Sequence, residues 1–188
     1  VVDMYHGIIQ HRDYITEYLR DQILSRKLEA PIGYGRIYRI VHSSTRRGRR
    51  PSLSKQTPAQ LVDLLSHPNG WLRDTAQRLL VERGDPTVVS LLKTKAASAP
   101  AATTRLHALW TLDGLDSIDG DLVARALGDS SRDVRASAIR LSERWLSEPG
   151  HPVQAAVLKL EHDPDWAVRR QLVASLGEDA RAQLDHGL

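Results

Sequence analysis

The feature that most constrains the fold of this chain is a sequence motif that occurs four times in its second part. Each copy has an arginine near its start, and the four arginines are Arg73, Arg105, Arg135 and Arg169. They lie 32, 30 and 34 residues apart in a chain of 188 residues. Self-similarity at a period of about thirty residues indicates a repeat architecture, in which each copy is one small structural unit.

An apolar pattern with the period of an α-helix runs through each copy of the motif. In the third copy the apolar positions i, i+4, i+7 and i+11 are Val134, Ala138, Leu141 and Trp145. Residues at this spacing lie on one face of a helix. Each copy therefore predicts a helix that buries one apolar stripe.

A second, shorter helix is predicted before each of these helices. In the first unit its apolar residues are Leu61, Leu64 and Leu65, and turn-forming residues separate it from the longer helix. Thr57-Pro58 marks its start, because a capping side chain precedes a proline at the first helical turn. A single hairpin cannot shield its apolar stripe from water, whereas stacked hairpins can. We therefore predict a mainly α fold, an α-solenoid of about four helical hairpins over residues 57–188.

The predicted units resemble HEAT repeats of the short bacterial type, which also occur in bilin-lyase-like proteins. The segment Asp133-Val134-Arg135-Ala136-Ser137-Ala138 carries this resemblance most closely, whereas the second unit has Thr104 and no aspartate before it. In that family the arginine commonly joins a polar ladder between stacked repeats. The resemblance implies the same role for Arg73, Arg105, Arg135 and Arg169. A structural role, in which the arginines cap turns and hold the stack together, is favoured over ligand binding.

The charge of the chain is unevenly distributed. Residues 1–56 carry 11 Lys and Arg against 5 Asp and Glu, whereas residues 57–188 carry 15 against 18. A run of Ser, Arg and Gly that is typical of a linker contains Arg46, Arg47, Arg49 and Arg50. We predict a basic linker over residues 43–56, and its four arginines form a candidate patch for an acidic partner.

Residues 1–42 do not fit the repeat. The segment 1–9 predicts a strand, 13–28 predicts a helix that contains Ile15, Leu19 and Ile23 at four-residue spacing, and 35–42 alternates like a strand. A strand-helix-strand arm is too small to be a stable domain by itself. We expect this arm to pack on the solenoid or on protein outside the present sequence.

Three segments of the chain, residues 2–11, 35–40 and 67–78, together resemble a junction in large exported bacterial dehydrogenase-like proteins. In those proteins a β-propeller of the sugar-dehydrogenase type is followed by HEAT repeats, and often by a cytochrome c domain. The resemblance implies that residues 1–42 are the last piece of a propeller and that the parent protein is exported or periplasmic. Most of the propeller, with its quinone-cofactor and calcium sites, lies outside this sequence, and a CxxCH motif is absent. No catalytic, cofactor-binding or metal-binding residue is therefore assigned.

The sequence carries no motif of an enzyme class. It has no cysteine, which excludes disulfides and thiolate zinc sites, and it lacks a Walker loop, HExxH and GxSxG. No apolar run approaches the ~20 residues that span a bilayer. We expect a non-catalytic scaffold that binds a protein partner or the adjacent domains of its parent chain.

The four tryptophans allow an alternative function. They are Trp71, Trp110, Trp145 and Trp166, and they either pack as structural aromatics or line a concave surface. Such a surface could hold a flipped base, as in HEAT-like DNA glycosylases. The basic run from Arg36 to Lys55 favours contact with phosphates, whereas the net negative charge of residues 57–188 opposes a nucleic-acid groove. A nucleic-acid-binding protein or a DNA glycosylase is thus the alternative to a scaffold.

Overall fold

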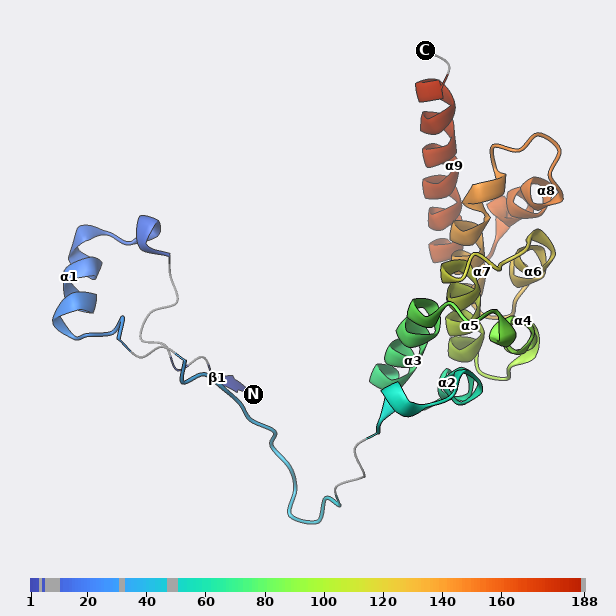
Figure 1. Cartoon of the computed structure of the whole chain (residues 1–188). Coiled ribbons are helices and arrows are strands. Elements are labelled where there is room, and N and C mark those ends of the chain that lie inside the picture. The colour runs from blue at the N-terminus through green and yellow to red at the C-terminus, as the bar shows by residue number, and fades with distance from the viewer. Residues whose placement is uncertain (4, 6–10, 31–32, 47–50, 187–188) are drawn as a thin grey trace. The chain divides into compact units, whose positions relative to one another are not determined.

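The computed structural model describes residues 1–3, 5, 11–30, 33–46 and 51–186 (Figure 1). The chain divides into two compact units, Val1–Arg50 and Pro51–Leu188. Residues 51–56, which the sequence assigns to the linker, belong to the second unit because they pack on its first hairpin. There Leu53 is only 6% exposed, and the guanidinium of Arg83 donates to the carbonyl oxygens of Gln56 at 2.6 Å and Ser54 at 2.9 Å.

The described residues of the first unit form a two-stranded antiparallel sheet and one α-helix. In the sheet β1 (Val2–Asp3) pairs with β2 (Arg36–Ile37). Between the strands lie the 3-10 helix η1 (Arg12–Tyr14) and α1 (Glu17–Ser25). No residue of α1 is buried among the described residues, and Leu19 and Leu24 are exposed.

The predicted order of strand, helix and strand is present in this unit, but each strand is only two residues long. Two strands without a third strand or a packed helix have little to stabilise a longer ladder. Of the predicted first strand, residues 4 and 6–9 lie outside the described part of the chain.

The second unit consists of four helical hairpins. Their first helices are α2 (Pro58–Leu64), α4 (Val89–Ser98), α6 (Gly120–Ala126) and α8 (Pro152–Leu158). Their second helices are α3 (Gly70–Arg83), α5 (Ala102–Gly114), α7 (Arg132–Ser142) and α9 (Trp166–His186). Short 3-10 helices complete the unit: η2 (Leu53–Lys55), η3 (Pro86–Val88), η4 (Glu143–Trp145) and η5 (Lys159–His162).

Local sequence signals fix where the hairpin helices begin and end. At the start of α2, Thr57 and Gln60 form a capping box, in which the Gln60 amide donates to Thr57 Oγ1 and the Thr57 amide donates to Gln60 Oε1. At the end of α3, Gly84 takes the left-handed conformation with φ of 60°. This conformation costs little for glycine and stops the helix.

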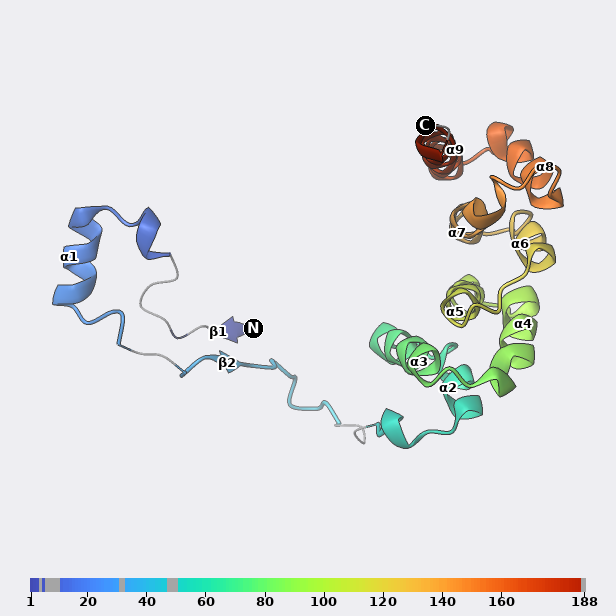
Figure 2. The same cartoon turned by 45° about the horizontal axis from the view of Figure 1, so that its top comes forward.

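The hairpins stack side by side in two layers. The second helices α3, α5, α7 and α9 contact one another in chain order, and so do the first helices α2, α4, α6 and α8. Figure 2 shows the second helices along the inner side of a curved stack and the first helices along its outer side. The predicted mainly α fold, an α-solenoid of four HEAT-like hairpins, is confirmed.

The apolar stripes meet between the two layers. Ala76, Ala108 and Ala138 of successive second helices are fully buried, and these small side chains allow close approach of the helices. In the third unit Val134, Ala138 and Leu141 are buried as predicted, and Trp145 is half-buried against the same core.

Candidate functional site

The four repeat arginines lie at the turns between the two helices of each hairpin. Arg105 shows the full arrangement. Its Nη1 donates to the carbonyl oxygens of Ala99 at 2.7 Å and Pro100 at 3.1 Å, in the turn of its own hairpin. Its Nε and Nη2 donate to the two carboxylate oxygens of Asp129, both at 2.7 Å. Because Asp129 lies in the turn of the next hairpin, this side chain links two repeats.

Arg135 repeats this arrangement at the next junction. Its Nε and Nη2 donate to the carboxylate of Asp163 at 2.7 Å and 2.9 Å, and its Nη1 donates to the carbonyl oxygen of Asp129 at 2.9 Å. The side chains of both partners are largely buried, with exposed fractions of 13% for Arg135 and 3% for Asp163. A bidentate pair of this kind is stronger and more directional than a surface ion pair.

Electrostatics at the two junctions show that the carboxylates are engaged. The hydrogen bonds from Arg135 lower the pKa of Asp163, against the opposing effect of burial. At Asp129 burial works to raise the pKa, but the hydrogen bonds from Arg105 and from the Ser131 amide hold it below its ordinary value. Both carboxylates stay ionised at neutral pH and join neighbouring hairpins through their arginine partners.

The first junction uses a histidine in place of an aspartate. Ala99 occupies the turn position that corresponds to Asp129 and Asp163, and Arg73 Nε instead donates to His107 Nε2 at 3.2 Å. The other ring nitrogen of His107, Nδ1, is 2.7 Å from Gln77 Oε1 and therefore carries the proton. Burial and then the charge of Arg73 lower the pKa of His107, which favours this neutral form.

Arg169 makes only the contact to the turn of its own hairpin. Its Nη1 donates to the carbonyl oxygen of Asp163 in its own hairpin, and its guanidinium lies over the ring of Trp166 at 5.9 Å. Its Nε and Nη2 have no acceptor among the residues that the structure describes.

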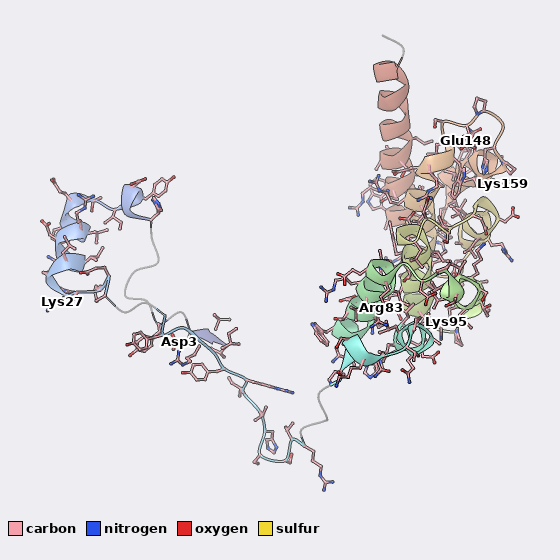
Figure 3. The ribbon with its side chains drawn as sticks, viewed as in Figure 1. Asp3, Lys27, Arg83, Lys95, Glu148 and Lys159 are labelled. Atoms are coloured by element: carbon pink, nitrogen blue, oxygen red, sulfur yellow. The ribbon has the colours of Figure 1, made fainter. Side chains whose placement is uncertain are left out.

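The outer layer of first helices has ion pairs of its own. Lys95 of α4, labelled in Figure 3, lies 3.4 Å from the carboxylate of Asp63 of α2. Lys93 lies 2.6 Å from the carboxylate of Asp119, the residue that caps α6. These pairs are more exposed to solvent than the turn pairs and contribute less to stability.

Most of the predicted acidic-partner patch lies outside the described part of the chain. Arg46 is exposed in the first unit, and Arg47, Arg49 and Arg50 lie outside the described residues. The tryptophans are dispersed over the second unit. Trp71 and Trp166 are exposed, Trp110 is half-buried, and Trp145 stacks on the ring of His151 at 5.6 Å.

A groove on the second-helix layer lies between α3 and α5 and has a volume of about 440 Å³. Its lining residues are Asp74, Gln77, Arg78, Val81, Glu82, Trp110, Asp113 and Gly114. Gly114 permits the close approach of the two helices there, because a Cβ at this position would lie 2.7 Å from Val81 Cγ2. Three acidic side chains and one basic side chain border the half-buried ring of Trp110, so the lining residues are net negative. Arg78 pairs with Glu82, and Arg144 of η4 pairs with Asp113, which leaves Asp74 as the lining carboxylate without an arginine or lysine partner among the described residues.

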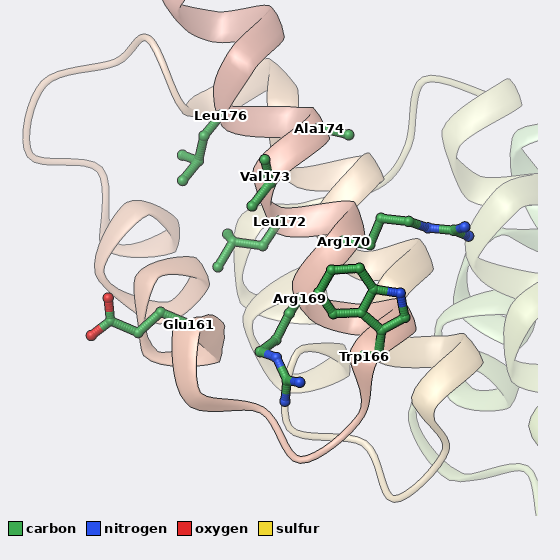
Figure 4. Close-up of a pocket in the computed structure, with 8 residues that line it drawn as sticks. All are labelled: Glu161, Trp166, Arg169, Arg170, Leu172, Val173, Ala174 and Leu176. Carbon is green, nitrogen blue, oxygen red and sulfur yellow. The ribbon is translucent and has the colours of Figure 1, made fainter.

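A second hollow, of about 610 Å³, lies at the last hairpin between η5 and α9 (Figure 4). Its lining residues are Glu161, Trp166, Arg169, Arg170, Leu172, Val173, Ala174 and Leu176. It is mostly apolar and is bordered by one acidic and two basic side chains.

Within the described residues, no three histidine or carboxylate side chains are grouped closely enough to hold a metal ion. In the same part of the chain, no helix has the length and apolar character needed to span a membrane.

Sequence reasoning named the four arginines but not their acceptors. Asp129 and Asp163 each lie six residues before the next arginine, and this shared spacing is the signal that could have identified them. No such signal identifies His107, because it lies within helix α5 and not at the turn position of the two aspartates.

Comparisons with known proteins give one matching family model and one similar solved structure. A family model described as "Domain of unknown function (DUF7133)" matches residues 1–44, within the first unit. A search of the curated proteins gives no match. Among solved structures, the complex of CpcE and CpcF of phycocyanin lyase from Nostoc sp. PCC7120 is similar, with 19% sequence identity and a TM-score of 0.49. This similarity covers 63% of the present chain and 79% of that chain.

Proposed function

We propose that the chain is a non-catalytic helical scaffold whose solenoid binds a protein segment in the groove between α3 and α5. The observation that carries this proposal is the groove itself, in which a half-buried tryptophan lies among acidic side chains on the inner helix layer. Arg105 and Arg135, by contrast, are occupied with the turn aspartates Asp129 and Asp163 and hold the hairpins together.

The chemistry of the groove favours a partner segment that combines a cation with a small apolar side chain. Asp74 is 73% exposed and can pair with an arginine or lysine of the partner, whereas Glu82 already lies 3.6 Å from Arg78 of its own helix. The face of Trp110 can receive a guanidinium by a cation–π contact. The floor near Val81 and Gly114 suits an apolar group.

A protein partner is favoured over nucleic acid at this surface. The groove is net negative and would repel phosphates. Arg105 and Arg135 are bound to carboxylates of the next hairpin and are not available to neutralise a nucleic-acid backbone.

Titration of the isotope-labelled chain with a short peptide of alternating arginine and alanine tests this function. We expect chemical-shift changes at the Trp110 indole and along α3 and α5, and no such changes with the corresponding glutamate peptide. Asp74→Lys, at an exposed position, should weaken peptide binding by about tenfold, because one favourable charge contact becomes repulsive. No shift at α3 and α5 with about 1 mM peptide, the concentration of very weak binding, would reject the groove as the binding surface.

For the first unit, we propose that residues 1–42 complete a β-propeller of a larger exported dehydrogenase-like protein. Two observations support this. The strands β1 and β2 are short, and Ile37 is 85% exposed, as expected of a sheet that lacks neighbours. The family match also ends at residue 44, close to the end of this segment. The basic segment that contains Arg46, Arg47, Arg49 and Arg50 would then bind an acidic surface of the parent protein.

The coding region upstream of Val1 tests the proposed parent directly. We expect it to encode many short strands with turns between them, as in a propeller, and a signal for export. An upstream region with the helical period throughout, or with no strand pattern, would contradict the propeller assignment.

A further inference from the structure

The two ends of the solenoid differ in how they are covered. At the first end, η2 packs against α3, and Arg83 holds it through the carbonyl oxygens of residues 53, 54 and 56. Leu53 is buried there. The first hairpin thus has a cap that comes from its own chain, as terminal repeats of solenoids require.

The last end has no equivalent cap among the described residues. The repeat register makes the comparison direct, because the residue four positions after the repeat arginine is apolar in the last three units. This residue is Leu109 in α5 and Ile139 in α7, and both are 0% exposed. In α9 it is Val173, which is 72% exposed. The last second helix therefore presents to solvent a position that is buried in the two units before it.

The repeat arginine at this end is also left without the partner that it has at the two junctions before it. Arg169 keeps its contact to its own turn. Its Nε and Nη2, the atoms that bind an aspartate in Arg105 and Arg135, have no acceptor among the described residues. Figure 4 shows Glu161 on one side of the apolar residues of α9 and Arg170 on the other. Both side chains are exposed.

We propose that this end binds the same end of a second copy of the chain about a two-fold axis that passes close to Val173. The contact surface, here named the end face, consists of Glu161, Trp166, Arg169, Arg170, Val173 and Leu176. A two-fold interface needs a self-complementary surface. The end face meets this condition, because rotation about the axis brings Glu161 of each copy to the basic side of the other.

Two features favour this arrangement over head-to-tail stacking of copies. At the first end of the solenoid η2 already packs on α3, with Leu53 only 6% exposed, so this surface is occupied by the chain's own residues. In addition, α9 has 21 residues, against 11 in α7, and continues past α7 in Figure 1. Two α9 helices that cross near Val173 can therefore contact one another over a greater length than two helices as short as α7 could. This proposal uses a different surface from the α3–α5 groove and does not depend on the proposed function.

A cross-linking experiment tests the two-fold axis in the full chain. The chain has no cysteine, so Val173→Cys introduces a single thiol. Two thiols beside a two-fold axis can reach disulfide geometry, which requires a Cα–Cα distance of about 4.4–6.8 Å. We expect mild oxidation to convert most of this variant to a covalent dimer, and the matched Leu91→Cys variant on α4 to form no disulfide-linked dimer. No dimer with Val173→Cys, or the same yield from both variants, would overturn the proposal.

Sedimentation velocity over a range of protein concentrations tests the charge pairing. Glu161→Arg and Arg170→Glu should each raise the dimer dissociation constant by about tenfold, because each places like charges against one another. The combined Glu161→Arg and Arg170→Glu variant should return to near the wild-type constant. Circular dichroism checks that all variants fold, which is expected because both positions are exposed.

Three outcomes would contradict the inference. A wild-type chain that stays monomeric up to about 1 mM, the range of very weak association, would show that the end face does not bind a second copy. A dimer that neither single charge reversal weakens would place the contact elsewhere. Assembly into open-ended filaments would show head-to-tail stacking. None of these results bears on peptide binding in the α3–α5 groove, so the two proposals fail separately.

Discussion

The two units of this chain differ in what covers their apolar residues. In the second unit each helical stripe is buried against a neighbouring hairpin, and Leu141 on α7 is 4% exposed. In the first unit α1 has the same kind of four-residue spacing, yet Leu19 is 44% exposed and no residue of the helix is buried. An amphipathic pattern therefore predicts a helix in both units, but among the described residues a surface that buries the stripe is present only in the second unit.

The aromatic residues make this comparison easy to measure. All five tyrosines lie between Tyr5 and Tyr38 in the first unit, and all four tryptophans lie between Trp71 and Trp166 in the second. Tryptophan fluorescence thus reports on the solenoid alone. The largest expected effects are in the paired turns of the solenoid and the smallest are in the basic segment of the first unit.

The largest effect is expected from Asp163→Ala. Removal of this buried carboxylate leaves Arg135 without its bidentate partner and the Asp165 amide without its acceptor. A broken buried pair costs about 3–5 kcal/mol. Urea denaturation followed by tryptophan fluorescence measures the loss. The exposed pair of Arg132 and Asp133 provides the control, and Asp133→Ala should cost below about 1 kcal/mol. Equal losses in the two variants would show that the turn pairs are no stronger than surface pairs.

A direct comparison of the two units comes from leucine truncation. Leu141→Ala should destabilise the solenoid by about 2–5 kcal/mol, because it leaves a cavity in a packed core. Leu19→Ala should change the free energy of unfolding by at most about 0.5 kcal/mol, as is usual for an exposed position. The first is measured by urea denaturation and the second by hydrogen exchange of the α1 amides. A loss well under 1 kcal/mol for Leu141→Ala would mean that this stripe is not a core.

A smaller effect is expected from pH at the first junction. In the folded chain the pKa of His107 lies below its ordinary value, through burial and the charge of Arg73, while Asp74 at 3.9 Å opposes the shift. The unfolded chain therefore binds more protons between the two pKa values, and stability rises with pH across that window. The stability contributed by neutral His107 is complete above about pH 6.5, the ordinary pKa of histidine. It is lost as the pH falls toward the lower pKa that His107 has in the folded chain.

Denaturation curves between pH 5 and 8 for the wild type and His107→Gln isolate this contribution. The difference between the two proteins should grow as the pH rises through the window, since the variant has no titrating ring at this position. A difference that stays constant with pH would show that His107 does not titrate differently in the folded and unfolded chains.

The smallest effect is expected from Arg46→Ala. This side chain is exposed in the first unit, and exposed charges contribute little to folding. Tryptophan fluorescence during urea denaturation should therefore give the same free energy of unfolding within about 0.5 kcal/mol. A clear destabilisation of the solenoid would show that the basic segment contacts it.

The fold was predictable from the sequence because it depends on local period and repetition. Leu61, Val134 and Leu172 are all buried as their helical spacing predicts. The arginine contacts depend on the distance between successive turns. The superhelical geometry sets this distance, and it cannot be read from the sequence. For this reason Asp163 reads as a helix cap in the sequence, although in the structure it also accepts from an arginine 28 residues earlier. The exposed surface of α1 could not be foreseen either, because spacing does not say what a stripe packs against.

The turn aspartates also determine where this protein can tolerate changes in loop length. Asp129 and Asp163 each serve two arginines, one through the carboxylate and the other through the carbonyl oxygen. An inserted residue in either of these turns would displace both contacts at once. The connections at 115–119 and 146–151 join one hairpin to the next and do not serve these arginines. Insertions that enlarge the protein should therefore accumulate along that edge of the solenoid, and the turn edge should keep a fixed length.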